Sequence, residues 1–134
     1  MIDSAIVLDA AALSAAADES ATIQEWVEAA IQSDRPFSLS AVTMAETTDG
    51  SGRDVAVRRV ANNAAVHDVT PEIAYAAGAM RAQVRRRKQR DLTVDAIVAA
   101  TAASLPGLVV VVTSDPSDLE ALLDGTDVRV ASIT

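Results

Sequence analysis

The chain has 134 residues and half of them are hydrophobic, which is enough for one domain over residues 1–134 with a packed core. It contains no cysteine, so disulfides and thiolate metal sites are excluded. Its one histidine, His67, cannot by itself build a histidine metal site or a Ser-His-Asp triad. The start has an acid at position 3 and no basic segment, and no uncharged apolar run is long enough to span a membrane. We therefore expect a cytoplasmic protein.

The first half of the chain predicts short strands that alternate with helices. An apolar run ends at Asp9, and an alanine-rich segment follows it. Further along, the apolar residues recur at the i, i+3, i+4 spacing of an amphipathic helix; they are Ile23, Trp26, Val27, Ala30 and Ile31. We expect strands at residues 5–8, 37–39 and 66–69, and helices at residues 10–17 and 20–32, around Glu46, and at 54–61.

The second half continues this alternation. Pro71 suits the first position of a helix, and Ile73, Ala77, Met80 and Val84 give that helix an apolar stripe. Four valines follow Leu108, a pattern typical of a parallel strand buried on both faces. We expect helices from Pro71, from Thr93 and at residues 116–123, and strands at residues 108–112 and 128–133.

Regular alternation of strands and helices indicates an α/β fold with a parallel sheet. We expect a three-layer α/β/α arrangement around a small central parallel sheet. In such sheets, ligands bind at the carboxyl ends of the strands. Candidate site residues are therefore sought at that edge.

Four acidic residues have positions that would bring them to this edge. They are Asp9 and Asp115 at the ends of apolar runs, Asp95 at the start of a helix, and Glu46 within another helix. Each has an ordinary structural explanation when it is taken alone. Asp9 and Asp115 can cap helices. The helix dipole stabilises the negative charge of Asp95 by roughly 0.3–1 kcal/mol, and Glu46 can simply face water.

The conjunction of the four acids points beyond these explanations. Two carboxylates about 5 Å apart repel each other by roughly 3 kcal/mol at an effective dielectric of 20. Four together are tolerated only with protonation or with a cation. Because Mg²⁺ and Mn²⁺ prefer oxygen ligands and retain bound waters, we expect a site for Mg²⁺ (or Mn²⁺).

Charge is distributed unevenly along the chain. The net charge is −8, yet nine of the eleven basic residues lie between residues 53 and 90. Such a segment can grip the phosphates of a nucleic acid, and it can equally be a solvated helix surface. The candidate RNA-binding residues are Arg81, Arg85, Arg86, Arg87 and Lys88.

Four segments of the chain, in this order, carry a family resemblance: IVLDAAAL, SAVTMAETTDGSGR, VDAIVAATAA and VVTSDPSDLEAL. With them the chain resembles a PIN domain over nearly its whole length. It is similar in particular to the VapC-like toxin ribonucleases of type II toxin–antitoxin pairs. The family's closing T-x-D is present as Thr113-Ser114-Asp115.

The resemblance implies a Mg²⁺- or Mn²⁺-dependent endoribonuclease that cleaves RNA phosphodiester bonds with metal-activated water. By position it implies that the catalytic and metal-binding acids are Asp9, Glu46, Asp95 and Asp115, with Thr113 and Asp118 as accessory candidates. It further implies a homodimer and a cognate antitoxin protein that blocks the acidic site.

Alternatives remain open at this point. The family often has a serine two residues after its first aspartate, and this chain has Ala11 there. A second hypothesis is therefore a catalytically impaired PIN-like module that binds RNA or a protein. A third is a DNA-directed nuclease with the same metal chemistry. The sequence lacks a P-loop motif, and Asp9 has no acid two positions on, which argues against a nucleotidase and a phosphoaspartate phosphatase.

Overall fold

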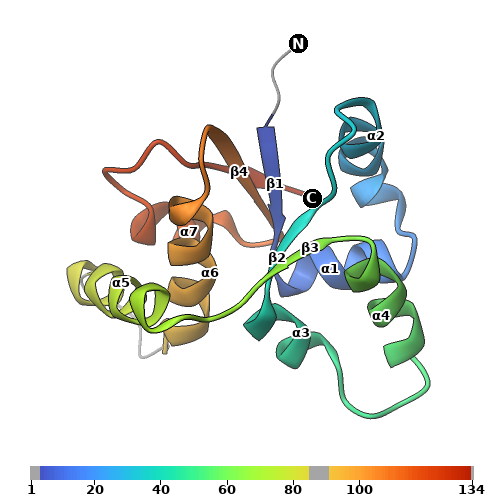
Figure 1. The fold of residues 1–134 in the computed structure, drawn as a ribbon, viewed down its shortest axis with the longest axis horizontal. Helices are drawn as coiled ribbons and strands as arrows, with labels where there is room; N and C mark the ends of the chain where they lie inside the picture. The colour runs from blue at the N-terminus through green and yellow to red at the C-terminus, as the bar shows by residue number, and fades with distance from the viewer. Residues whose placement is uncertain (1–3, 85–90, 134) are drawn as a thin grey trace.

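The computed structural model describes residues 4–84 and 91–133, which form a parallel sheet covered by helices (Figure 1). The sheet order is β3-β2-β1-β4-β5, and every neighbouring pair is parallel. The strands are β1 (Ser4–Leu8), β2 (Ser38–Ser40), β3 (Ala65–His67), β4 (Leu108–Thr113) and β5 (Arg129–Ser132). The predicted α/β fold with a central parallel sheet is confirmed.

Helices connect the strands, and prolines mark several of the boundaries. Pro71 and Pro116 each stand at the start of a helix, and Pro36 lies in the irregular segment before β2. The helices are α1 (Ala10–Ala17), α2 (Gln24–Gln32), α3 (Ala41–Thr47), α4 (Asp54–Asn62), α5 (Pro71–Gln83), α6 (Thr93–Ser104) and α7 (Pro116–Leu122). Among the described residues, none of them is long and apolar enough to cross a membrane.

Two apolar cores lie on opposite faces of the sheet. Figure 1 shows α1, α2 and α4 on one side of the strands and α5, α6 and α7 on the other. On the first side, Leu8, Leu13 and Leu39 are fully buried in one cluster. On the second side, alanines of α6 pack against Val7 and Val111. Because alanine is small, α6 can lie close to the sheet. These layers match the predicted three-layer arrangement.

β4 lies between β1 and β5, as the run of valines predicted for an internal strand. Val111 and Val112, neighbours on opposite faces of β4, are both completely buried. The stripe predicted for α5 is also confirmed, because Ala77 is buried and Ile73 and Met80 pack against the same core.

Two details of the predicted helix at residues 20–32 are wrong. Its first turn, Ala21–Ile23, is a 3-10 helix, and the α-helix begins at Gln24. The hydroxyl of Ser20 caps that turn by accepting from the Thr22 N–H at 3.3 Å. Ile31 belongs to the apolar stripe by spacing but is 72% exposed, although Val27 and Ala30 of the same helix pack against the core. Periodicity tells which face is apolar, but not how far the neighbouring elements extend.

Candidate metal and nuclease site

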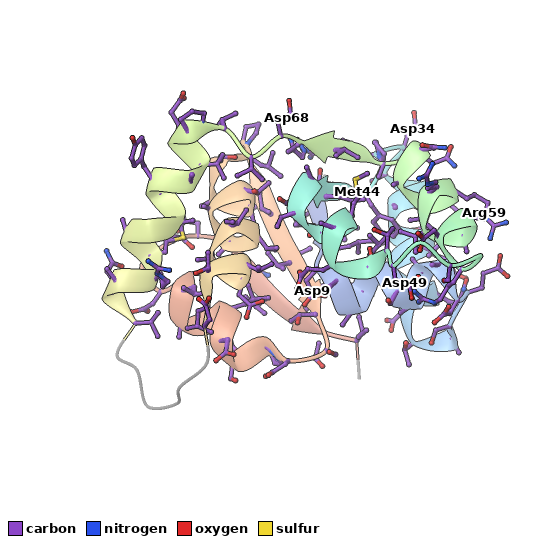
Figure 2. The ribbon with its side chains drawn as sticks, turned by 90° about the horizontal axis from the view of Figure 1, so that it is seen from below. Asp9, Asp34, Met44, Asp49, Arg59 and Asp68 are labelled. Carbon is purple, nitrogen blue, oxygen red and sulfur yellow. The ribbon has the colours of Figure 1, made fainter. Side chains whose placement is uncertain are left out.

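The carboxyl edge of the sheet carries Asp9 at its centre. Asp9 directly follows β1, and its N–H donates to the carbonyl of Val112 at 3.2 Å, which continues the pairing of β1 with β4. The register pairs Leu8 with Val112 and Val7 with Ser38. When this register is extended to Asp9, Thr113 of β4 lies on one side of it and Ser40 of β2 lies on the other. Figure 2 views the molecule from this edge and shows Asp9 near its middle, beside α3.

Several donors hold the Asp9 carboxylate in place. Its Oδ1 accepts from the Ala12 N–H at 2.9 Å, so Asp9 is the N-cap of α1, as one of its structural explanations anticipated. The Ala11 N–H and the Thr113 hydroxyl also lie close enough to lower the pKa of this carboxyl. Even so, burial raises the pKa of Asp9, with a smaller raising effect from the charge of Asp115, and together these outweigh the hydrogen bonds.

Glu46 approaches the same place from α3. It lies in the last turn of that helix, where the helix dipole disfavours a negative charge by roughly 0.3–1 kcal/mol. Glu46 is exposed, yet desolvation by the groups around its carboxylate raises its pKa, and repulsion from Asp95 and then from Asp9 raises it further. Three carboxylates from three separate elements are therefore within electrostatic reach of one another. No capping role explains the position of Glu46.

Asp95 and Asp115 complete the set of four acids. Asp95 is half-buried in the first turn of α6. Asp115 stands at the N-cap position of α7 but makes no side-chain cap bond, so the capping explanation is wrong for it. Its Oδ1 instead accepts from the Ser117 hydroxyl at 3.1 Å. Its N–H donates to the Thr113 hydroxyl at 3.1 Å. Thr113 thereby joins the backbone of Asp115 to the carboxylate of Asp9.

The donor chemistry of this edge suits a hard divalent cation, because it consists of carboxylate oxygens. Across residues 4–84 and 91–133, however, no group of three or more acidic, histidine or cysteine side chains is arranged so that it could hold a metal ion. Mg²⁺ does not require one, since it is commonly held by one or two carboxylates and retains several waters. A site with one or two direct carboxylate ligands and several waters is the kind that these acids could supply. Their mutual repulsion is what a cation would relieve.

The other predicted site residues have varied positions. Asp118 is half-buried in the first turn of α7. Arg81 is exposed on α5, and its guanidinium donates to the Thr93 hydroxyl at 2.6 Å, at the start of the helix that carries Asp95. The remaining RNA-binding candidates, Arg85, Arg86, Arg87 and Lys88, lie outside the described residues.

Two hydroxyl residues near the acids were not predicted as site residues. Ser40 is fully buried at the end of β2 and caps α3, because its hydroxyl accepts from the Val42 N–H at 3.3 Å. Thr43, also fully buried, lies one turn before Glu46. A serine placed immediately before a helix was a readable capping signal. Nothing in the local sequence pattern distinguishes Thr43 from an ordinary helix residue.

Comparisons with known proteins identify the fold of the chain. The sequence model of the family described as PIN domain matches residues 6–121. A DNA-bound VapBC structure from Salmonella typhimurium is similar over 100% of both chains, with 19% identity and a TM-score of 0.70. A VapBC2 structure from Rickettsia felis, bound to a promoter DNA fragment, has 11% identity and a TM-score of 0.66 over 98% of both chains.

A FitAB structure bound to the IR36 DNA fragment is similar over 96% of this chain and 94% of its own, with 20% identity and a TM-score of 0.64. Comparison with curated proteins gives no match. At these low identities the structural likeness bears on the fold alone. The match of the family sequence model independently covers most of the chain.

Proposed function

This chain belongs to the PIN domain family, and we propose that it is a Mg²⁺- or Mn²⁺-dependent endoribonuclease, the toxin of a type II toxin–antitoxin pair. The single observation that carries the proposal is that acids from separate elements at the carboxyl edge lie near enough to repel one another. Glu46 of α3 interacts with Asp95 of α6 and with Asp9 after β1, and Asp9 interacts with Asp115. A fold gains no stability from such repulsion, so a function that uses a cation accounts for it.

The similar structures support the toxin part of the proposal. VapBC and FitAB are toxin–antitoxin complexes, and the chains that match are equivalent to this one in length and fold. We propose a cognate antitoxin as the protein partner of this chain, and a homodimer as its assembly. Co-expression with the product of a neighbouring reading frame tests the first, and light scattering tests the second.

The four acids have different roles in the proposed enzyme. A bound divalent ion would supply Lewis acidity that lowers the pKa of water and offsets charge on the phosphate. Asp9 and Asp95 are the proposed direct or water-mediated ligands, and Asp115 and Glu46 orient waters around them. Thr113 fixes the rotamer of Asp9 through its hydrogen bond. No protein nucleophile is required, since water attacks the phosphodiester.

The decisive experiment is Asp95→Asn in a metal-dependent RNA cleavage assay. We expect the cleavage rate to fall by at least about a hundredfold, because a ligand charge is removed while the size of the side chain is kept. Asp124→Asn, an exposed aspartate beyond α7, is the matched control and is expected to cleave at the wild-type rate. Equal rates for the wild type and Asp95→Asn would remove Asp95 from the mechanism.

A catalytically impaired binding module is the second candidate, and Ala11 favours it. Ala11 is half-buried beside Asp9 and supplies only a backbone N–H to that carboxylate, where the family often has a hydroxyl. Titration with Mn²⁺ separates the two candidates. An active enzyme binds Mn²⁺, and the Asp9→Asn substitution abolishes this binding. The impaired module binds RNA but does not cut it when Mn²⁺ is present.

A further inference from the structure

Thr43 has a buried hydroxyl that the fold itself does not use. Its side chain is completely buried, and its Oγ1 has no hydrogen-bond partner among the residues that the structure describes. Leaving a buried hydroxyl without a partner costs about 1–3 kcal/mol. Valine has nearly the same shape and carries no such cost. A fold selected for stability alone would favour valine at this position.

Local geometry explains why this hydroxyl is left over. A threonine inside a helix usually bonds to the carbonyl four residues earlier. Thr43 is the third residue of α3, so the residue four positions before it, Leu39, belongs to β2 and has a strand conformation. Thr47, one turn later, does make such a bond, since its hydroxyl donates to the Thr43 carbonyl at 2.9 Å. The hydroxyl of Thr47 therefore has a backbone hydrogen-bond partner, whereas the hydroxyl of Thr43 on the same helix has none among the described residues.

Thr43 faces the interior of the molecule. Val42 packs against the core of α6, and Met44 packs against the core on the α1 side. The face between them, which holds Thr43, is therefore turned into the molecule, in agreement with its burial. Ser40, three residues before it, is beside Asp9 in the register of the sheet, and Glu46, three residues after it, interacts with Asp9 and Asp95.

We propose that Thr43 is a positioning residue of the acidic site, and that its hydroxyl holds one buried water that bridges α3 to the carboxylates of Asp9 and Glu46. A buried water needs two to four polar partners, and the Thr43 hydroxyl and these two carboxylates are the partners that we propose for it. The water would fix the distance between α3 and β1. Its role in metal binding rests on the proposed function, but its existence does not.

The first test is a crystal structure of the metal-free wild-type protein at a resolution that shows ordered waters. We expect a water within hydrogen-bond distance of Thr43 Oγ1 and of a carboxylate oxygen of Asp9 or Glu46. A Thr43 hydroxyl that bonds only to a protein carbonyl, or that has no water beside it, would overturn the proposal. This result is independent of whether the protein cleaves RNA.

The second test compares Thr43→Val with Thr43→Ser. We expect the valine variant to keep the fold and to bind Mn²⁺ about tenfold more weakly, as removal of an outer partner of a metal ligand does. The serine variant keeps the hydroxyl and is expected to bind Mn²⁺ as the wild type does. Equal Mn²⁺ affinity of wild type and Thr43→Val would contradict the positioning role. If the wild type binds no Mn²⁺, the proposed function fails, and the crystal structure alone decides on Thr43.

Discussion

Asp9 combines two roles that pull in different directions. As the N-cap of α1 it stabilises the helix through its bond to the Ala12 N–H. As a charged group in a partly buried position beside other acids, it is destabilised by desolvation and by repulsion from Asp115. Substitutions that remove the charge of Asp9 but keep its N-cap hydrogen bond, or remove both, therefore test the two roles separately.

We expect Asp9→Ala to lower the free energy of unfolding by about 1 kcal/mol, because alanine cannot cap α1. Asp9→Asn should change it by less than this, since asparagine caps about as well and the removal of the charge relieves repulsion. Urea denaturation measures both values. Both variants should lose metal-dependent RNA cleavage, so that stability and activity separate. Equal destabilisation by the two substitutions would show that the charge, and not the cap, supports the fold.

The raised pKa values of Asp9 and Glu46 give stability a definite dependence on pH. A raised folded pKa means that the native state holds a proton where the unfolded chain has released it. The associated stability is fully present below the unfolded pKa and is lost as the pH rises through the folded pKa. We therefore expect the metal-free wild type to lose stability over that interval relative to the variant that combines Asp9→Asn with Glu46→Gln. Urea denaturation between pH 3 and pH 7 measures the difference, because this range includes the ordinary carboxyl pKa of about 4.

At the scale of the elements, the site depends on where helices begin and end. α1, α6 and α7 all begin at the carboxyl edge of the sheet, and Asp9, Asp95 and Asp115 lie at or beside those starts. α3 also begins at this edge, directly after β2, but it carries Glu46 in its last turn. The depth at which α6 packs consequently sets where Asp95 lies relative to the other acids.

Enlarging a buried residue of α6 should disturb both the core and the site. Ala99 is completely buried, so Ala99→Leu is expected to cost about 1–3 kcal/mol through overpacking. Ala103→Leu, on the exposed side of the same helix, is the matched control and should be nearly neutral. Thermal unfolding measures stability, and calorimetric Mn²⁺ titration measures the site. A neutral Ala99→Leu would mean that α6 is less closely packed than its burial indicates.

At the scale of the whole molecule, a net charge of −8 lies over a fold whose carboxyl edge is itself acidic. A cation bound there would reduce repulsion in the native state alone. We expect Mn²⁺ at about one hundred times its dissociation constant to stabilise the wild type by about 2.7 kcal/mol, with a corresponding rise in Tm. Calorimetry of the wild type and Asp95→Asn, with and without Mn²⁺, measures this. An equal rise in both would place the cation elsewhere.

The basic segment provides a separate test of RNA binding. Replacing Arg85, Arg86 and Arg87 with serine should weaken RNA binding at low salt and reduce its salt dependence, because phosphate contacts release counterions. A control is the pair Arg58→Ser and Arg59→Ser, which removes exposed arginines of α4 that are not among the candidate RNA-binding residues. Filter binding across a salt series measures both. Unchanged affinity in the triple variant would identify the segment as a solvated surface.

The sequence by itself determined the local structure and the kind of chemistry. Apolar runs and helical spacing are local properties, so they located the elements to within a few residues, including β4 and the stripe of α5. The four acids could also be proposed as site residues from the sequence, because each follows a predicted strand or lies in a predicted helix. The absence of cysteine and the single histidine left carboxylates as the main metal-binding groups.

Only the tertiary structure decided which of these groups meet. The order β3-β2-β1-β4-β5 makes β1 and β4 neighbours, although about a hundred residues separate Asp9 from Thr113. Only that adjacency lets the Thr113 hydroxyl bond to Asp9. The exposure of Ile31 and the leftover hydroxyl of Thr43 were likewise invisible in the sequence. Periodicity fixes the direction of a side chain relative to its own helix or strand, whereas its partners depend on elements distant in the chain.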